Sequence, residues 1–254
     1  MGESMVQTNA TNTIAIGVDS FETLRKGHLF YIDKTDFILD WWNKGDKVSL
    51  ITRPRRFGKT LNMSMMECFF SVKFHERADL FDGLKVWENQ EIRREQGTWP
   101  VLFLTFANVK QATWPQTKKL INTMIWILYN SYDWMIQDSM FTDVDRKLFY
   151  RVNDEMDDET AALSLHNLCG WMEKYYGKKV LIFLDEYDTP MQEAWINGFW
   201  DKMVAYMRSL FSSTFKTNPH LSRAIMTGIT RISKESIFSD MNNLTQINWK
   251  SFRF

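Results

Sequence analysis

The most constraining feature of the chain is a β-favouring run, Val48–Thr52, followed by the stretch Arg-Pro-Arg-Arg-Phe-Gly-Lys-Thr at residues 53–60. Beyond it, apolar side chains recur at the spacing of an α-helix, at Leu61, Met65, Phe69 and Val72. A strand, a loop and a helix in this order bring backbone N–H groups to a helix N-terminus, where they bind phosphate. In such loops a lysine reaches the β- and γ-phosphates, and the hydroxyl after it binds Mg²⁺. Lys59 and Thr60 are the residues predicted for these two roles.

A second motif completes this prediction. The apolar run Val180–Leu184 is uninterrupted, as expected for a strand buried on both faces of a parallel sheet, and it ends in Asp185 and Glu186. Asp185 is expected to hold the metal through water, and Glu186 to orient and deprotonate the water that attacks the γ-phosphate. Because a further strand and several helices separate the two motifs, the spacing favours ATPases that carry their own glutamate base. We therefore predict Mg²⁺-dependent ATP hydrolysis.

The basic loop departs from the usual pattern of phosphate-binding loops. That pattern has a glycine five residues before Gly58, and this chain has Arg53 there. Four cations within seven residues offset the lost backbone contacts by charge-assisted hydrogen bonds to phosphate. The whole loop is accordingly predicted to bind the nucleotide: Arg53, Pro54, Arg55, Arg56, Phe57, Gly58, Lys59, Thr60 and Leu61.

The same cations permit a different function. A basic loop also suits the backbone of a nucleic acid, so the alternative is a catalytically silent nucleic-acid-binding or protein-interaction module. A phosphotransferase is a further rival, but it requires an acceptor pocket that the sequence does not identify. Nucleotide binding is favoured because neither the helix entry nor the Asp185-Glu186 pair has a role in a bare basic patch.

A third group of candidates follows the apolar run Ala224–Thr227, which stops at Gly228. Thr227 is expected to bind the attacking water or the γ-phosphate, and Arg231 to reach charge that develops in the transition state. The alternatives, in which Thr227 caps a turn and Arg231 pairs with a carboxylate, carry equal weight. Asp188 is expected to be a turn or capping residue rather than a metal ligand.

The order of elements predicts an α/β fold, a mainly parallel sheet with helices on both faces. The predicted strands are 48–52, 101–106, 180–184 and 224–227, with the fourth between the first and third. The predicted helices are 58–72, 115–137, one from the acidic residues 157–159 to Gly177, and 191–215 with a break near Gly198. In helix 115–137 the inward residues are expected to be Leu120, Met124, Ile127 and Leu128. Residues 1–13 are expected to be a flexible tail and 14–245 one domain.

Composition narrows the cellular setting and the partners. Lys plus Arg equal Asp plus Glu, 31 against 31, so no overall field attracts nucleic acid or an anionic membrane. Cys68 and Cys169 lie in apolar segments and are expected to be buried thiols in a reducing cytoplasm. The four histidines show no ligand spacing, which argues against a chelated metal. No signal segment and no run of about 18 apolar residues predicts secretion or a membrane span.

Several stretches of the chain resemble one known family. They are Ile16-Gly17, Phe21, Leu24-Arg25, Tyr31–Thr35, Thr52–Asn62, Leu80–Leu84, Leu184–Pro190 and Thr227–Ser239. Together they resemble the prokaryotic AAA-ATPase-like family, whose members often carry a C-terminal restriction-endonuclease-like nuclease domain. The resemblance implies an AAA-like P-loop NTPase fold with ATP and Mg²⁺ as cofactors. It assigns Lys59 and Thr60 to the nucleotide, Asp185 and Glu186 to metal and base, and the region of Arg231 to a sensor.

The end of the chain departs from that family. Residues 246–254 look atypical, and the chain stops where a fifth strand, a helical lid and the nuclease domain are expected. The sequence therefore predicts a C-terminally truncated domain without nuclease activity and with weakened closure over the nucleotide. Apart from the nucleotide, the partners that remain open are a protein, a nucleic acid and further copies of the chain in an oligomer.

Overall fold

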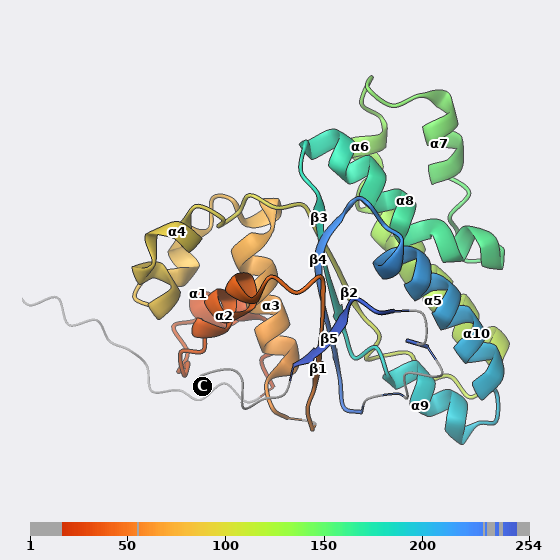
Figure 1. Ribbon diagram of the computed structural model, residues 1–254, viewed down its shortest axis with the longest axis horizontal. Helices are drawn as coiled ribbons and strands as arrows, with labels where there is room; N and C mark the ends of the chain where they lie inside the picture. Colours follow the sequence, from red (N-terminus) through yellow and green to blue (C-terminus); the bar gives the residue numbers. More distant parts are fainter. Residues whose placement is uncertain (1–16, 55, 231, 233–236, 239–240, 248–254) are drawn as a thin grey trace, which may run out of the picture.

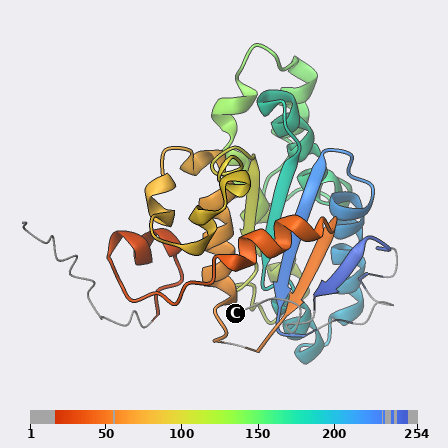
Figure 2. The same cartoon turned by 60° about the vertical axis from the view of Figure 1, so that its left-hand side comes forward.

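The fold is built on a five-stranded sheet in the order β2-β3-β4-β1-β5, with every neighbouring pair parallel. It is seen in a computed structural model that describes residues 17–54, 56–230, 232, 237–238 and 241–247. Figure 2 shows the strands side by side, with β5 at the edge next to β1. The strands are β1 (Val48–Thr52), β2 (Val101–Thr105), β3 (Val180–Asp185), β4 (Leu221–Gly228) and β5 (Leu244–Ile247).

Helices cover both faces of the sheet, as Figure 1 shows. One face carries α1 (Phe21–Lys26), α2 (Asp36–Lys44), α3 (Lys59–Phe70) and α4 (Gln90–Arg93). Three 3₁₀ turns follow α3, at Val72–Phe74, Ala78–Phe81 and Lys85–Glu88. The other face carries α5 (Trp114–Asn130), α6 (Asp133–Ile136), α7 (Asp143–Phe149), α8 (Asp158–Tyr176), α9 (Thr189–Ile196) and α10 (Trp200–Phe211), which ends in a π-helical turn, Ser212–Lys216.

Strand β3 divides the two hydrophobic cores. Val180, Ile182 and Leu184 belong to the core under α5, α8 and α10, whereas Leu181 and Phe183 belong to the core under α2 and α3. The alternation follows from the two-residue period of a strand, and every residue of β3 is buried. A strand covered on both faces is therefore fully apolar until it reaches Asp185.

Most of the predicted elements are found. The four predicted strands occur with shifts of a few residues, and β4 lies between β1 and β3 as expected. Helix α8 begins after Asp157, whose side chain accepts a hydrogen bond from the Thr160 N–H, and ends at the left-handed Gly177. Cys68 and Cys169 are buried free thiols. None of the helices in the described ranges combines the length and apolarity needed to cross a bilayer.

Three expectations about the fold are wrong. A fifth strand is present, because Leu244–Ile247 pairs in parallel with β1. The predicted helix 115–137 is interrupted after Asn130, where α5 ends, and α6 begins at Asp133. Of the four residues expected to face inward on this helix, Ile127 is 60% exposed, whereas the other three, Leu120, Met124 and Leu128, are partly buried against the core. The buried side chains of α5 are Thr117, Ile121, Asn122, Ile125 and Tyr129.

Candidate functional site

The predicted phosphate loop leaves β1 at Thr52 and enters α3 at Lys59. Its start is fixed by a hydrogen bond from the Arg53 N–H to the carbonyl oxygen of Gly228, 2.9 Å long. Its end turns through left-handed backbone at Arg56 (φ 67°) and Gly58 (φ 72°). Glycine adopts this region without the steric cost that a β-carbon adds, so Gly58 suits the last turn before the helix.

Lys59 folds back over the loop from the first turn of α3. Its ammonium donates to the carbonyl oxygens of Arg53 and Pro54, both at 3.0 Å, and the residue is 7% exposed. Because an ammonium has three N–H donors, one remains for a ligand after these two bonds. The lysine thus closes the loop and lines the pocket that the loop borders.

Asp185 joins this loop to the sheet. Its Oδ2 accepts a hydrogen bond from the Thr60 hydroxyl at 2.8 Å, and its Oδ1 accepts one from the Thr227 hydroxyl. Burial raises the pKa of Asp185 above its ordinary value, and the neighbouring Glu186 charge acts in the same direction. The hydrogen bonds from Thr227 and Thr60 and the charge of Lys59 act to lower that pKa. The carboxylate is therefore a desolvated group held by two hydroxyls.

Glu186 is the first residue after β3 and has left-handed backbone, with φ 52°. This conformation is uncommon for residues other than glycine and costs energy, so the surrounding contacts must hold it. The Glu186 N–H donates to the Thr227 hydroxyl at 3.4 Å, and the Thr189 hydroxyl donates to Glu186 Oε2 at 3.0 Å. Glu186 is thereby held half-buried, and it lines the same pocket as Lys59.

The pocket has a volume of about 450 Å³ and lies at the carboxyl ends of the strands, the lower end of the sheet in Figure 1. We call it the nucleotide pocket, after the ligand that the sequence motifs predict for it. Its lining includes six residues that the sequence motifs indicate: Arg56, Gly58, Lys59, Thr60, Leu61 and Glu186. It also includes five that these motifs do not indicate: Val18, Asp19, Ala107, Asn108 and Lys110. Residues 107–110 follow β2, which is next to β3, so the rule that carboxyl ends of parallel strands share one edge would have found them.

Other predicted site residues lie elsewhere. Arg53 is buried, 6% exposed, and is not part of the pocket lining; burial lowers its pKa to about 10. Phe57 is 53% exposed. Thr227 is buried and reaches the site through Asp185. Arg55 and Arg231 lie outside the described residues.

Thr60 and Asp185 are the residues suited to a metal. Mg²⁺ prefers oxygen ligands, and in nucleotide sites it is usually held by one or two carboxylates together with phosphate oxygens. A hydroxyl and a carboxylate that already lie 2.8 Å apart, with the hydroxyl residue lining the pocket, match that preference. Within the part of the chain that the structure describes, no three or more His, Cys, Asp or Glu side chains are grouped to hold a metal on their own.

Comparison with known proteins identifies the family of the chain. A family model described as "Predicted AAA-ATPase" matches residues 15–238, most of the chain. The chain belongs to the AAA-ATPase-like family. Membership implies nucleotide binding in general, and the matched region contains both the loop at 53–60 and the Asp185-Glu186 pair.

One curated relative of this AAA-ATPase-like chain is described as "Uncharacterized protein in vnfD 5'region" of Azotobacter chroococcum mcd 1. The two are 25% identical over 244 residues, which is 92% of this chain and 40% of the relative. The chain thus spans less than half of that relative's length. No solved structure matches the chain.

Proposed function

We propose that the chain binds ATP with Mg²⁺ and hydrolyses it. The observation that carries the proposal is the 2.8 Å hydrogen bond between Thr60, in the first turn of α3, and Asp185, at the end of β3. It brings together two motifs that are 125 residues apart in the sequence, in a pocket that Lys59 and Glu186 also line. An accidental match to either motif would not account for this convergence.

Each side chain has a distinct role in the proposed reaction. The loop 53–58 acts as the P-loop, and the backbone N–H groups at the start of α3 bind phosphate oxygens. Lys59 uses its remaining donor on the β- and γ-phosphates. Thr60 and Asp185 would hold Mg²⁺, which when bound supplies charge neutralisation at the phosphates. Glu186 accepts the proton of the attacking water, and its contact with Thr189 fixes its direction.

Calorimetry tests the binding part of this proposal. Lys59→Ala removes the charge at the phosphates and is expected to abolish ATP binding, whereas Lys147→Ala, at an exposed position on α7, leaves it unchanged. Chelation of Mg²⁺ is expected to stop turnover of the wild-type protein. Equal ATP affinity in wild type and Lys59→Ala contradicts the assignment.

Product analysis separates hydrolysis from its rivals. ADP and inorganic phosphate are the expected products, and a phosphorylated acceptor would indicate a phosphotransferase instead. Binding of DNA that weakens steeply with salt, without any ATP turnover, would favour the nucleic-acid-binding alternative.

A further inference from the structure

A third carboxylate, Asp188, lies near the proposed metal and base residues but outside the nucleotide pocket. It comes three residues after Asp185, is fully buried and does not line that pocket. It stands just before α9, yet its side chain does not cap that helix. The carboxylate faces the chain that follows β4 instead.

A single oxygen of Asp188 gathers four donors. Oδ2 accepts from the backbone N–H groups of Ile229 at 2.9 Å and Thr230 at 2.8 Å, and from the Thr230 hydroxyl at 2.9 Å. The fourth donor is the amide of Gln192 on α9, also at 2.9 Å. These four hydrogen bonds to one oxygen tie the segment after β4 and helix α9 to Asp188.

Gly228 makes this close approach possible. A β-carbon at position 228 would lie 2.7 Å from Asp188 Oδ1 and 2.7 Å from the ring of Tyr187, closer than such contacts occur. Asp188 Oδ1 accepts no hydrogen bond from any described residue and is buried against this glycine. The carboxylate is therefore packed onto the end of β4 as well as bonded to it.

We propose that Asp188 is a positioning residue for ATP hydrolysis, because it locks the turn that carries Glu186 to the strand end that carries Thr227. The proposal rests on the hydrolysis proposed above. Further hydrogen bonds around Asp188 join the two segments. The Tyr187 N–H donates to the Thr227 carbonyl at 3.0 Å, the Tyr187 hydroxyl donates to the Thr230 carbonyl at 2.8 Å, and the Glu186 N–H donates to the Thr227 hydroxyl.

We call these contacts between residues 186–188 and residues 227–230 the clamp. The clamp also extends to the phosphate loop. Gly228, which Asp188 packs against, accepts the hydrogen bond from Arg53 that fixes the start of that loop. Loss of the Asp188 contacts would thus loosen Glu186, Thr227 and the loop entrance relative to one another. A displacement of about 1 Å in a catalytic group can cost about 100-fold in rate.

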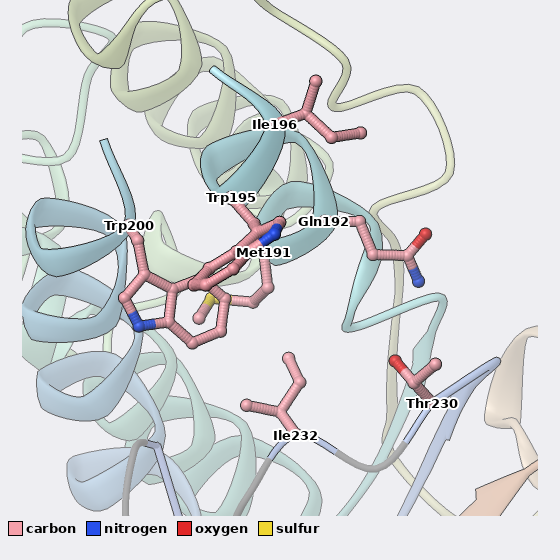
Figure 3. Close-up of a pocket in the computed structure, with 7 residues that line it drawn as sticks. All are labelled: Met191, Gln192, Trp195, Ile196, Trp200, Thr230 and Ile232. Carbon is pink, nitrogen blue, oxygen red and sulfur yellow. The ribbon is translucent and has the colours of Figure 1, made fainter. Parts of the chain in front are cut away.

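Gln192 and Thr230, which supply three of the four donors, also line an apolar pocket of about 490 Å³ (Figure 3). We call it the aromatic pocket. Figure 3 shows these two polar side chains on one side of the pocket and Trp200 on the opposite side. The remaining lining residues are apolar: Met191, Trp195, Ile196, Trp200 and Ile232. They make no hydrogen bond to Asp188, and they offer control substitutions close to the clamp.

The test uses graded substitutions with separate readouts for binding and turnover. Asp188→Asn keeps the shape and one acceptor but removes the charge, and is expected to lower kcat by about 10-fold; Asp188→Ala lowers it by about 100-fold. Thr230→Val removes only one of the four donors and is expected to lower kcat by about 2-fold. The Kd for ATP stays within about 3-fold of wild type in all three, because Lys59 and its loop N–H groups remain. Asp201→Asn, an exposed carboxylate on α10, is the matched control and leaves kcat unchanged.

Hydrogen exchange of the Ile229 and Thr230 amides supplies a readout that does not depend on turnover. Both amides are expected to be protected in wild type and to lose protection in Asp188→Asn. Unchanged protection, or a kcat for Asp188→Ala equal to that of wild type, overturns the inference. A parallel loss of kcat and of ATP affinity also overturns it, since that pattern indicates general unfolding. A wild-type protein that binds ATP without releasing phosphate overturns the proposed function instead, and with it any catalytic role of Asp188.

Discussion

The nucleotide pocket and the aromatic pocket differ in chemistry although both lie next to the short turn at residues 185–189. Glu186 lines the first, and Met191 and Gln192, on the helix that follows the turn, line the second. The first is lined by Lys59, Arg56, Thr60 and Glu186 around a glycine turn, and the second mostly by Trp, Ile and Met side chains. Their volumes are similar, about 450 and 490 Å³. The chemistry of each pocket therefore follows from the side chains that line it rather than from its size.

The three carboxylates of this turn have different partners. Asp185 faces Thr60 and Thr227, Glu186 lines the nucleotide pocket, and Asp188 takes donors from the edge of the aromatic pocket. The left-handed backbone of Glu186 is the point at which the chain changes direction. One four-residue stretch thereby supplies a metal ligand, a base and a clamp in the proposed reaction.

The largest expected effect is the loss of ATP hydrolysis when Glu186, in the nucleotide pocket, is replaced by glutamine. Glu186→Gln keeps the side-chain shape and can still accept from Thr189, but it removes the proposed base. We expect kcat for ATP hydrolysis to fall by about 10²- to 10⁴-fold, the usual contribution of a positioned general base. ATP affinity should change little, because Lys59 and the loop are intact. Phosphate release and calorimetry on the same preparation measure both quantities.

A Glu186→Gln variant that turns over ATP at the wild-type rate would place the base elsewhere. Glu193→Gln, on the first helix after the turn, is the matched control and should retain full activity.

Two short sequence motifs include six of the eleven residues that line the nucleotide pocket, because five of these six lie in one stretch, residues 56–61, and the sixth, Glu186, follows an apolar strand. The aromatic pocket joins α9, the start of α10 and the chain after β4. No short pattern marks such a pocket, because its residues meet only after the sheet has formed.

The errors in the fold prediction also concern features that a local sequence pattern does not mark. Helix α5 buries Asn122 because its side chain pairs across the core, accepting from the Tyr206 hydroxyl at 2.6 Å and donating to the Met156 carbonyl at 3.2 Å. Apolar periodicity cannot register a polar residue whose partners are distant in sequence. Strand β5 was missed because it is a short edge strand in which only Ile247 is buried. The uniformly apolar β3, buried on both faces, was the easiest element to predict.

A smaller expected effect is on the free energy of unfolding, through the buried carboxylate of Asp185. Because burial raises the pKa of Asp185, the folded protein disfavours its carboxylate, and stability is lost as the pH rises from the ordinary pKa through the raised one. Asp185→Asn cannot ionise, so without Mg²⁺ it should be more stable than wild type at pH 7, by on the order of 1 kcal/mol. The advantage should vanish on acidification below the ordinary Asp pKa. Chemical denaturation in chelator at several pH values measures it.

With Mg²⁺ and ATP present, the wild-type protein should be more stable than Asp185→Asn. The ligands stabilise the wild-type protein by mass action, whereas the variant has lost the carboxylate proposed to hold the metal. If Asp185→Asn without metal is less stable than wild type at pH 7, the carboxylate contributes more through its hydrogen bonds from Thr60 and Thr227 than its burial costs.

The smallest expected effect is that of replacing Trp195, in the aromatic pocket, on the free energy of unfolding. Trp195 is 71% exposed in the aromatic pocket, and its ring contacts Trp200 edge to face at 5.7 Å. Trp195→Ala should therefore change the free energy of unfolding by no more than about 0.5 kcal/mol, the usual range for surface substitutions. Trp41→Ala, in the core between α2 and the sheet and 1% exposed, should cost about 3–5 kcal/mol and serves as the buried counterpart. ATP turnover of Trp195→Ala should match wild type, because this side chain is not among the described hydrogen-bond donors to Asp188 and does not line the nucleotide pocket. A large loss of turnover in Trp195→Ala would show instead that the two pockets act as one site.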